Sequence, residues 1–352
     1  MKERLNKVKA KLEILDIPAL LISKKENQIY LSGFHSSNCY LIITKDKNYL
    51  LTDFRYFEAA GNLAPLYEPV LTGKEDTLFT FLQEMKFEKL AIEEEIISLS
   101  FYKELRDAFK GEIYSGDGII EEIRIVKDEG ELNSIAKAQS IADQCFSHIL
   151  NYIRPGLTEL EVAVEIEMYL RKHGAERLSF DTICVSGIRT SLPHGEPSDK
   201  VLKKGEFITL DYGCVIDGYC SDMTRTIALN SVSQEQKDIY NLVLEAQITG
   251  CNAIKAGIPC FDADKMVRDI ISEAGYGSQF GHGTGHGVGL EIHEAPTLNP
   301  KSKDILKENM VVTIEPGIYL PGKFGVRIED LAFVTPSSII NITKSNKELI
   351  VI

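Results

Sequence analysis

The sequence predicts an α+β protein of two domains: a small α/β domain over residues 1–123, then a larger domain over residues 124–352 with an internal pseudo-twofold repeat. Three observations predict this architecture. Strand-like and helix-like segments alternate in the first domain. A charged connector, EEIRIVKDEGE, then leads into a long helical pattern. Beyond that helix a similar succession of helix and strands occurs twice, and 352 residues have room for both domains.

The composition is typical of an ordinary globular protein. Apolar residues make up 44% of the chain and charged residues 26%. The formal net charge of −13 repels the phosphate backbone of nucleic acids, so no nucleic-acid partner is expected. No apolar run is long enough to span a bilayer, so no membrane partner is expected either.

The beginning of the chain and its cysteines favour a cytoplasmic protein. The stretch MKERLNKVKAKLEIL is not expected to be a signal peptide, because charges continue through it and no apolar core follows. The seven cysteines are scattered and form no CxxC pair. Buried thiols in a reducing compartment are therefore favoured over disulfides or a cysteine metal site.

The amino-terminal domain is predicted to start with an amphipathic helix and to contain at least three strands. The helix is indicated by Leu5, Val8, Leu12 and Leu15, which recur at helical spacing. The predicted strands are ALLIS (19–23), CYLIIT (39–44) and YLLTD (49–53), with a turn over 45–48 and a later helix around TLFTFLQEM (77–85). No constellation of catalytic side chains is found in this domain.

The larger domain begins with a long helix and then repeats one plan. The apolar face of that helix consists of Leu132, Ile135, Ala138, Ala142, Cys145, Phe146 and Ile149. The segment 154–174 resembles the segment 255–275, at an offset of 101 residues. In the first copy Thr158 and Glu161 form a capping box, and Gly174 is a natural end for the helix.

Polar residues recur in the same register in the strands that follow. Residues 194–213 echo residues 293–317, so that His194 corresponds to His293, Asp211 to Glu315 and Gly213 to Gly317. A duplicated half-site brings like residues together around a pseudo-twofold axis. A carboxylate from each copy is therefore expected at the centre of the domain.

The first pair of carboxylates is placed by a predicted hairpin. Asp217-Gly218 is the strongest short signal for a two-residue hairpin turn. With those residues as the turn, residue 216 pairs with residue 219, and Asp211 faces Thr224. Asp211 and Asp222 then become diagonal neighbours on one sheet face, with backbones roughly 7–8 Å apart, and can converge on a common ion.

The second copy offers Glu315 and Glu329. Glu315 ends the strand-like MVVTIE and is followed by Pro316-Gly317. In VRIED, Arg327 and Glu329 alternate onto one face of a strand. Both strands are strongly apolar, so these carboxylates are expected in a buried sheet, where they need partners.

The segment GHGTGHGVGLEIHE (281–294) holds three of the seven histidines. Its glycines disfavour a helix, and no Glu follows His282, so it is not the HExxH helix of a metalloprotease. In an extended segment His282, Thr284 and His286 share a face, and the pattern alone leaves open which histidine is a ligand. One imidazole and four carboxylates make a hard, oxygen-rich site whose charge balances two divalent ions.

Taken together, these motifs resemble the metallopeptidase family with the pita-bread fold, which includes Xaa-Pro aminopeptidase (aminopeptidase P), prolidase and methionine aminopeptidase. IYLSGF and LLTDFRY resemble the creatinase-like amino-terminal domain of that family. The resemblance to the catalytic half of the family lies in five segments, namely SLPHGEPSD, LDYGCVIDGYCSDMTRT, HGTGHGVGLEIHE, VVTIEPGIY and VRIED. The resemblance covers essentially the whole chain, and its motifs occur in the expected order.

The resemblance implies the roles of the site residues. The metal ligands would be Asp211, Asp222, His286, Glu315 and Glu329, with Asp222 and Glu329 bridging two divalent ions, most simply Mn²⁺ but otherwise Co²⁺, Zn²⁺ or Fe²⁺. His194 and His293 would contact the substrate and the tetrahedral intermediate, and His282 and Arg327 would support the site. Hydroxide formed at the metals would attack the scissile carbonyl, and Glu315 would carry the proton to the leaving nitrogen. The family also implies a homodimer.

The expected activity is that of an aminopeptidase acting on peptides with proline at the second position, and alternatives stay open. Prolidase is the main rival; prolidases often carry an arginine shortly after the third histidine for the free carboxylate of a dipeptide, and here Thr297 stands there. Methionine aminopeptidase normally lacks such an amino-terminal domain. A metal-free binding protein or amidinohydrolase is disfavoured because all five ligand positions are intact.

The remaining histidines are expected to lie outside the site. His35, His148 and His173 occur in helix or loop contexts without recognisable acidic partners. They are predicted to be surface or packing residues.

Overall fold

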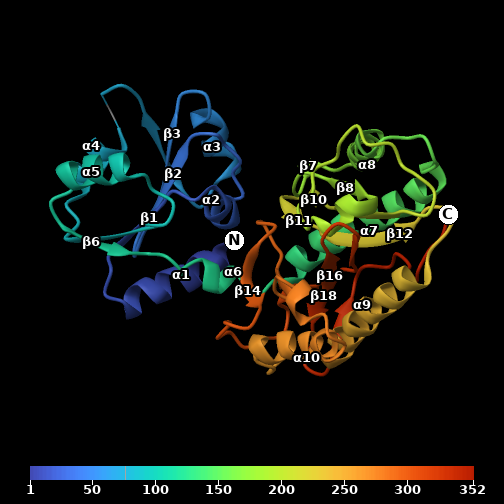
Figure 1. Ribbon diagram of the computed structural model, residues 1–352. Helices are drawn as coiled ribbons and strands as arrows, with labels where there is room; N and C mark the ends of the chain where they lie inside the picture. Colours follow the sequence, from blue (N-terminus) through green and yellow to red (C-terminus); the bar gives the residue numbers. More distant parts are fainter. Residues whose placement is uncertain (76) are drawn as a thin grey trace. The chain divides into compact units, whose positions relative to one another are not determined.

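The chain divides into two compact units, Met1–Arg124 and Ile125–Ile352, in the computed structural model, which describes residues 1–75 and 77–352 (Figure 1). Among those described residues, no helix is both long and apolar enough to cross a membrane.

The first unit is built on one mixed sheet. Its order, within the described residues, is β4-β3-β2-β1-β5-β6. The strands are β1 (Ala19–Ile22), β2 (Cys39–Thr44), β3 (Asn48–Asp53), β4 (Glu68–Thr72), β5 (Lys89–Ile92) and β6 (Glu112–Ser115). The helices are α1 (Lys2–Ile14), α2 (Lys25–Ser32), α3 (Phe57–Leu63), α4 (Leu78–Met85), α5 (Leu99–Ala108) and α6 (Glu121–Arg124). The pairs β1–β2 and β2–β3 are antiparallel, and the remaining neighbours are parallel.

The elements predicted for this unit are confirmed, with one error at the first helix. β1, β2, β3 and α4 fall on the predicted segments, and Leu78 and Leu82 of α4 pack with Leu21 and Leu51 of the sheet. Leu5, Val8 and Leu12 are buried as expected. Leu15 is 52% exposed, because α1 ends at Ile14 and the helical periodicity stops there.

The second unit consists of four long helices and a set of mostly antiparallel strands. The helices are α7 (Glu129–Tyr152), α8 (Glu159–Lys172), α9 (Gln234–Ala253) and α10 (Cys260–Glu273), with short 3₁₀ turns η1 (Gly187–Ser191) and η2 (Gly277–Gln279). The strands of the first half are β7 (Arg177–Leu178), β8 (Ile183–Ser186), β9 (Phe207–Tyr212), β10 (Cys214–Ile216), β11 (Tyr219–Cys220) and β12 (Met223–Ala228). Those of the second half are β13 (Gly285–Gly287), β14 (Glu294–Leu298), β15 (Val311–Ile314), β16 (Gly317–Leu320), β17 (Phe324–Arg327), β18 (Asp330–Val334) and β19 (Ile339–Asn341).

The internal repeat is confirmed at the level of individual elements. α8 and α10 start at Glu159 and Cys260 and end at Lys172 and Glu273, so that both ends lie 101 positions apart. The predicted capping box of Thr158 begins α8. Strands β12-β9-β8 of the first half and β18-β15-β13 of the second are neighbours in the same order, and every one of these pairs is antiparallel. The duplication therefore sets strands β9 and β15 in equivalent places.

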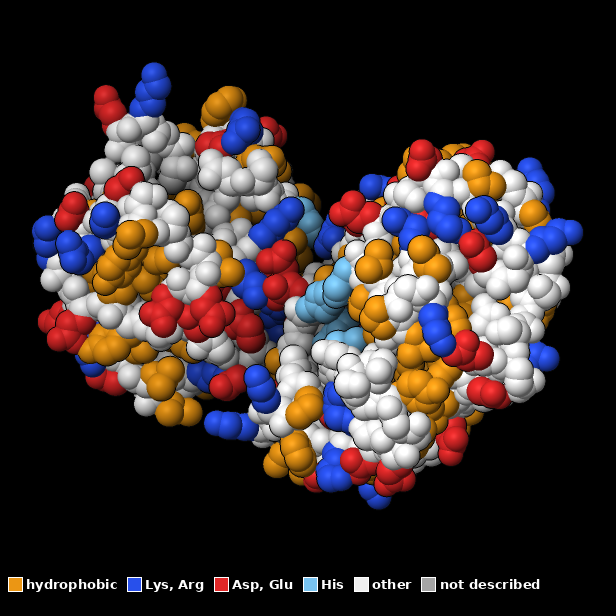
Figure 2. All heavy atoms as spheres, viewed as in Figure 1, with side chains coloured by type: hydrophobic (Ala, Val, Ile, Leu, Met, Phe, Trp, Pro, Cys, Tyr) orange, Lys and Arg blue, Asp and Glu red, His pale blue; other side chains and the backbone are white. Residues whose placement is uncertain are grey.

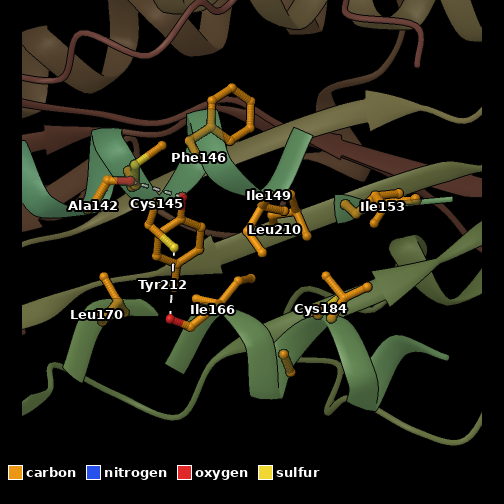
Figure 3. Close-up of a cluster of buried hydrophobic side chains, with 14 of the residues drawn as sticks. Ala142, Cys145, Phe146, Ile149, Ile153, Ile166, Leu170, Cys184, Leu210 and Tyr212 are labelled. Carbon is orange, nitrogen blue, oxygen red and sulfur yellow. Dashed lines mark hydrogen bonds between the residues drawn. The ribbon is translucent and has the colours of Figure 1, made fainter. Parts of the chain in front are cut away.

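The core of the first repeat lies between α7, α8 and the strands (Figure 3). Tyr212, at the end of β9, is fully buried there and donates its hydroxyl to the carbonyl of Ala142 on α7 at 3.1 Å. Burial raises the pKa of the Tyr212 phenol well above its ordinary value. This core holds the end of β9 rigidly, and the neighbouring residue is Asp211.

Candidate active site

All side chains that the sequence assigned to the site line one cavity of about 910 Å³ in the second unit. They are His194, Asp211, Asp222, His282, His286, His293, Glu315, Arg327 and Glu329. Figure 2 shows several histidine side chains, in pale blue, close together on the visible surface. Residues separated by more than a hundred positions in the sequence thus share one cavity.

The hairpin that carries the two aspartates has the predicted register. Ile216 pairs with Tyr219, and Asp211 pairs with Thr224. Asp217 and Gly218 have φ values of 51° and 84°, as a type I′ turn requires. Asp211 and Asp222 are both buried and both line the cavity.

Each of the two glutamates of the second repeat is held by a threonine, Thr284 for Glu315 and Thr224 for Glu329. The backbone N–H of Glu315 donates to the carbonyl of Thr284 at 2.8 Å. Thr224 binds Glu329 twice, because its carbonyl accepts the Glu329 N–H at 3.1 Å and its hydroxyl donates to Glu329 Oε2 at 2.7 Å. Since Thr224 belongs to β12 of the first repeat, this contact joins the two repeats at the site.

The segment that carries His286 is the short strand β13 and not a helix, which agrees with the expectation that its glycines disfavour a helix. A Cβ at Gly285 would lie 2.0 Å from the Thr313 carbonyl oxygen, and one at Gly287 would lie 2.3 Å from that of Ala295. Glycines on both sides of His286 therefore allow β13 to fit between β14 and β15.

The two histidines that the sequence could not separate differ in what their ring nitrogens do. In both rings Nδ1 lies close to the following carbonyl, at 2.8 Å for His282 and 3.0 Å for His286, so Nδ1 carries the proton and Nε2 is free to accept. Nε2 of His282 lies 2.9 Å from the hydroxyl of Tyr319. Nε2 of His286 lies 3.6 Å from Asp222 Oδ2 and 3.4 Å from Glu315 Oε1. The geometry favours His286 as the ligand.

The expectation that Thr284 shares a face with these histidines is wrong. The Thr284 hydroxyl and its backbone N–H both donate to Oδ1 of Asp264 on α10, each at 2.9 Å. The strand begins only at Gly285, so side chains do not alternate regularly across 282–284.

The residues present fit a divalent cation. Single ligand atoms of Asp222, His286 and Glu329 all lie within 4.8 Å of one another. Asp211 has one oxygen, Oδ2, bound to Arg327 Nη2 at 2.5 Å. Its other oxygen, Oδ1, is buried and has no hydrogen-bond partner among the described residues, which is costly unless a cation satisfies it.

The electrostatics of the site point the same way. Burial, and then the neighbouring carboxylates, raise the pKa of Asp222 and Glu329 well above their ordinary values. Burial also raises the pKa of Glu315 to about 8, against the effect of Arg327. Burial lowers the pKa of His286 to about 4, so the ring is neutral at pH 7. Four crowded carboxyl groups and a neutral imidazole form a donor set for cations.

His194 and His293 lie on the solvent side of the site. Both are exposed, and the rings of His293 and His286 make an edge-to-face contact with centroids 4.4 Å apart. Partial burial, followed by the neighbouring His194, lowers the pKa of His293. This position leaves both rings accessible to a bound molecule.

Two features of the site were missed by sequence reasoning. Tyr319 accepts a hydrogen bond from Arg327 Nη1 at 2.8 Å and lies 2.9 Å from His282 Nε2, so it connects the two. Arg268 binds Asp264 and also the carbonyl of His282, at 2.6 Å. The i,i+4 spacing of Asp264 and Arg268 on a predicted helix was a readable signal. No signal marked Tyr319.

One statement about the remaining histidines is also wrong. His148 does have an acidic partner, because its Nε2 lies 2.6 Å from Glu165 Oε1. Its ring stacks on Tyr169 of α8 at a centroid distance of 4.8 Å. His148 is a packing residue between α7 and α8, outside the cavity.

Comparison with known proteins gives consistent matches over the whole chain. The creatinase/prolidase N-terminal domain matches residues 4–126, and metallopeptidase family M24 matches residues 133–336. A Xaa-Pro dipeptidase of Pyrococcus horikoshii is 39% identical over 350 residues, 98% of each chain. The structure of a Xaa-Pro dipeptidase from Bacillus anthracis superposes with a TM-score of 0.97 at 43% identity, covering 100% of this chain and 99% of that one. An X-Pro aminopeptidase from Thermotoga maritima has a TM-score of 0.92 at 36% identity, covering 99% of each chain.

Proposed function

This chain belongs to metallopeptidase family M24, and from that premise we propose that it releases the amino-terminal residue from peptides whose second residue is proline. Its creatinase-like domain precedes a pita-bread catalytic domain. The relatives above are named as Xaa-Pro dipeptidases and as an X-Pro aminopeptidase, so the family supports the bond before proline as the target.

The charge of the cavity lining favours an aminopeptidase over a dipeptidase. Among the described residues Arg327 is the only arginine or lysine of the lining, and its guanidinium is already paired with Asp211. Thr297 stands where the family resemblance suggests an arginine in prolidases. A dipeptide would place its free carboxylate in this lining without a cation, whereas a longer peptide presents a neutral peptide bond.

The second candidate function is that of a Xaa-Pro dipeptidase. The names of the Pyrococcus horikoshii and Bacillus anthracis relatives favour it, at 39% and 43% identity over nearly the whole chain. The two candidates share the site and differ only in how the carboxyl-terminal side of the substrate is bound.

We propose that two divalent cations bind in this site. Their ligands would be Asp211, Asp222, His286, Glu315 and Glu329, with Asp222 and Glu329 shared between the ions. Such an oxygen-rich set suits Mn²⁺, with Co²⁺, Zn²⁺ and Fe²⁺ as alternatives. When bound, the cations supply Lewis acidity and an acidified water for attack on a peptide carbonyl.

The other residues of the cavity are proposed to bind the substrate and to move the proton. Glu315 would take a proton from the attacking water and deliver it to the leaving nitrogen of proline. His293 would donate to the carbonyl oxygen as negative charge develops on it, and His194 would contact the peptide. Arg327 and His282 would act through Asp211 and Tyr319, which they bind.

A homodimer in the cytoplasm is the proposed state of the protein. The family resemblance supports the dimer, and the seven cysteines, all without a disulfide, support a reducing compartment. Light scattering on the purified protein would distinguish a dimer from a monomer.

The proposed activity is tested by comparing kcat/KM for Xaa-Pro dipeptides and Xaa-Pro-Yaa peptides, with Mn²⁺, Co²⁺ or Zn²⁺ added. Xaa-Ala-Yaa peptides serve as the control for the proline requirement. We expect the longer proline peptides to be preferred. An enzyme that cleaves only dipeptides would be a prolidase, and one that cleaves Xaa-Ala-Yaa equally well would contradict the proline specificity.

A further inference from the structure

The loop that carries His194 needs an anchor outside the histidine itself. It runs from the end of β8, at Ser186, through η1 to Ser198 and includes no strand. His194 is exposed, and no hydrogen bond joins its ring to another described residue. The position of this ring is therefore set by the backbone of the loop.

Glu159, the first residue of α8, binds both ends of that loop. Its Oε1 accepts from the N–H of Ser186 at 2.7 Å and from the Ser186 hydroxyl at 2.8 Å. Its Oε2 accepts from the N–H of Ser198 at 3.2 Å and from the Ser198 hydroxyl at 2.7 Å. One carboxylate thus closes the loop at its two ends.

The middle of the loop is tied to the same carboxylate through Arg189. Arg189 Nε donates to Glu159 Oε2 at 3.0 Å, and Arg189 Nη2 donates to the carbonyl of Glu196 at 2.6 Å. Glu159 is 0% exposed, so its charge needs compensation, and Arg189 supplies it. Glu196 lies only two positions beyond His194.

The geometry points to Glu159 as a positioning residue that holds His194 at the edge of the cavity. This inference rests on the proposed function, since it assigns Glu159 to the binding of the substrate by His194. Glu159 does not line the cavity. It acts through the loop, because charge-assisted hydrogen bonds at both ends of the loop restrict the positions of the His194 side chain.

In the second repeat, the segment that carries His282 is also bound by a buried acid and an arginine. Asp264 on α10 is 1% exposed and accepts from both the N–H and the hydroxyl of Thr284. Arg268 neutralises Asp264 and donates to the carbonyls of Phe280 and His282. In each repeat a buried acid on the equivalent helix, paired with an arginine, thus anchors the segment that carries a histidine of the cavity.

The test combines hydrogen exchange with a double-mutant cycle on the metal-loaded enzyme. Glu159→Gln removes the charge and one acceptor oxygen; we expect faster exchange of the amides of Ser186 and Ser198 and a loss of kcat/KM for Xaa-Pro-Yaa on the order of tenfold, at unchanged metal content. In a His194→Ala background the same change should cause little further loss. Glu129→Gln, at the first position of α7 and exposed, is the matched control and should leave both quantities unchanged.

The inference would be overturned if the loss of kcat/KM in the double variant equalled the product of the losses in Glu159→Gln and His194→Ala. Unchanged hydrogen exchange of the Ser186 and Ser198 amides in Glu159→Gln would overturn it as well. If Glu159→Gln does not fold, Ser198→Ala removes one of the anchoring bonds and is expected to give the same pattern at smaller size. A wild type that does not cleave Xaa-Pro-Yaa contradicts the proposed function instead, and the exchange measurement still decides whether Glu159 holds the loop.

Discussion

The hydroxyl of Tyr319 lies 2.9 Å from Nε2 of His282 and occupies the one ring nitrogen that could bind a cation. Arg327 donates to the same hydroxyl at 2.8 Å, so the hydroxyl proton is directed to His282. Burial and the nearby Arg327 lower the pKa of His282 to about 4, which keeps the ring neutral and able to accept. The hydrogen bond to Tyr319 therefore occupies Nε2 of His282, whereas Nε2 of His286 stays available for the proposed ligand role.

Replacing Tyr319 by Phe should test this relationship. The change leaves the buried Nε2 of His282 without its donor, and we expect a loss of about 1–3 kcal/mol in the free energy of unfolding. Metal content should not change, because Tyr319 is not a proposed ligand. Urea unfolding measures the effect, and Tyr276→Phe is the control, since that hydroxyl makes no hydrogen bond among the described residues. Equal stability of the two variants would argue against the role of Tyr319.

The proposed pair of cations depends on Asp222. Asp222→Asn keeps the shape of the side chain but removes a negative charge that both ions would share, so we expect loss of at least one metal and of most activity. Metal analysis and turnover measure the two effects. Asp217→Asn, in the exposed turn of the same hairpin, is the control and should keep both metals. Retention of two ions and normal turnover by Asp222→Asn would show that the assignment is wrong.

His194 is expected to contact the substrate and not a metal. His194→Ala should therefore leave the metal content unchanged while it lowers kcat/KM by about tenfold or more. His148→Ala, at a packing site outside the cavity, is the matched control and should have normal turnover. Metal loss in His194→Ala would make His194 a ligand and contradict the proposed role.

An arginine at position 297 should improve the binding of dipeptides. Thr297 is exposed and lines the cavity, so Thr297→Arg places a cation where a free carboxylate is expected. The ratio of kcat/KM for Xaa-Pro over Xaa-Pro-Yaa should rise by roughly tenfold. Ser337→Arg adds the same charge outside the cavity and should not change the ratio. An unchanged ratio in Thr297→Arg would mean that the carboxylate is bound elsewhere.

Metal binding should release protons at pH 7. In the metal-free protein the pKa of Glu315 is raised to about 8, and those of Asp222 and Glu329 are also raised, so these groups carry protons that a cation must displace. The affinity for Mn²⁺ should thus increase from about pH 6 to about pH 8. His286, with a pKa of about 4, is already neutral and adds nothing in this range.

Calorimetric titrations with Mn²⁺ in two buffers of different ionisation enthalpy measure the released protons. Glu315→Gln should release fewer than the wild type, because the amide has no proton to lose. Heats that are the same in both buffers would contradict the raised pKa values.

Local sequence determined much of the frame of this protein. The Asp217-Gly218 turn was sufficient to predict the pairing of Asp211 with Thr224, because a two-residue hairpin turn sets the register of both strands. The offset between the two helices of the repeat was also readable, since helix starts and ends carry their own signals at Thr158 and Gly174. The error at Leu15 and the error at Thr284 both come from extending a regular period past the end of an element.

Only the tertiary structure decided which of the predicted site residues have a side-chain atom that is available to bind a cation. The sequence places His282 and His286 in equivalent glycine-rich surroundings, and only the fold brings Tyr319 to one ring and Asp222 to the other. The buried Glu159 was likewise not recognisable as the anchor of the His194 loop, because its partners Ser186 and Ser198 are 27 and 39 positions away. Periodicity and turn chemistry act over a few neighbouring residues, whereas hydrogen bonds across a cavity depend on how distant strands and helices pack.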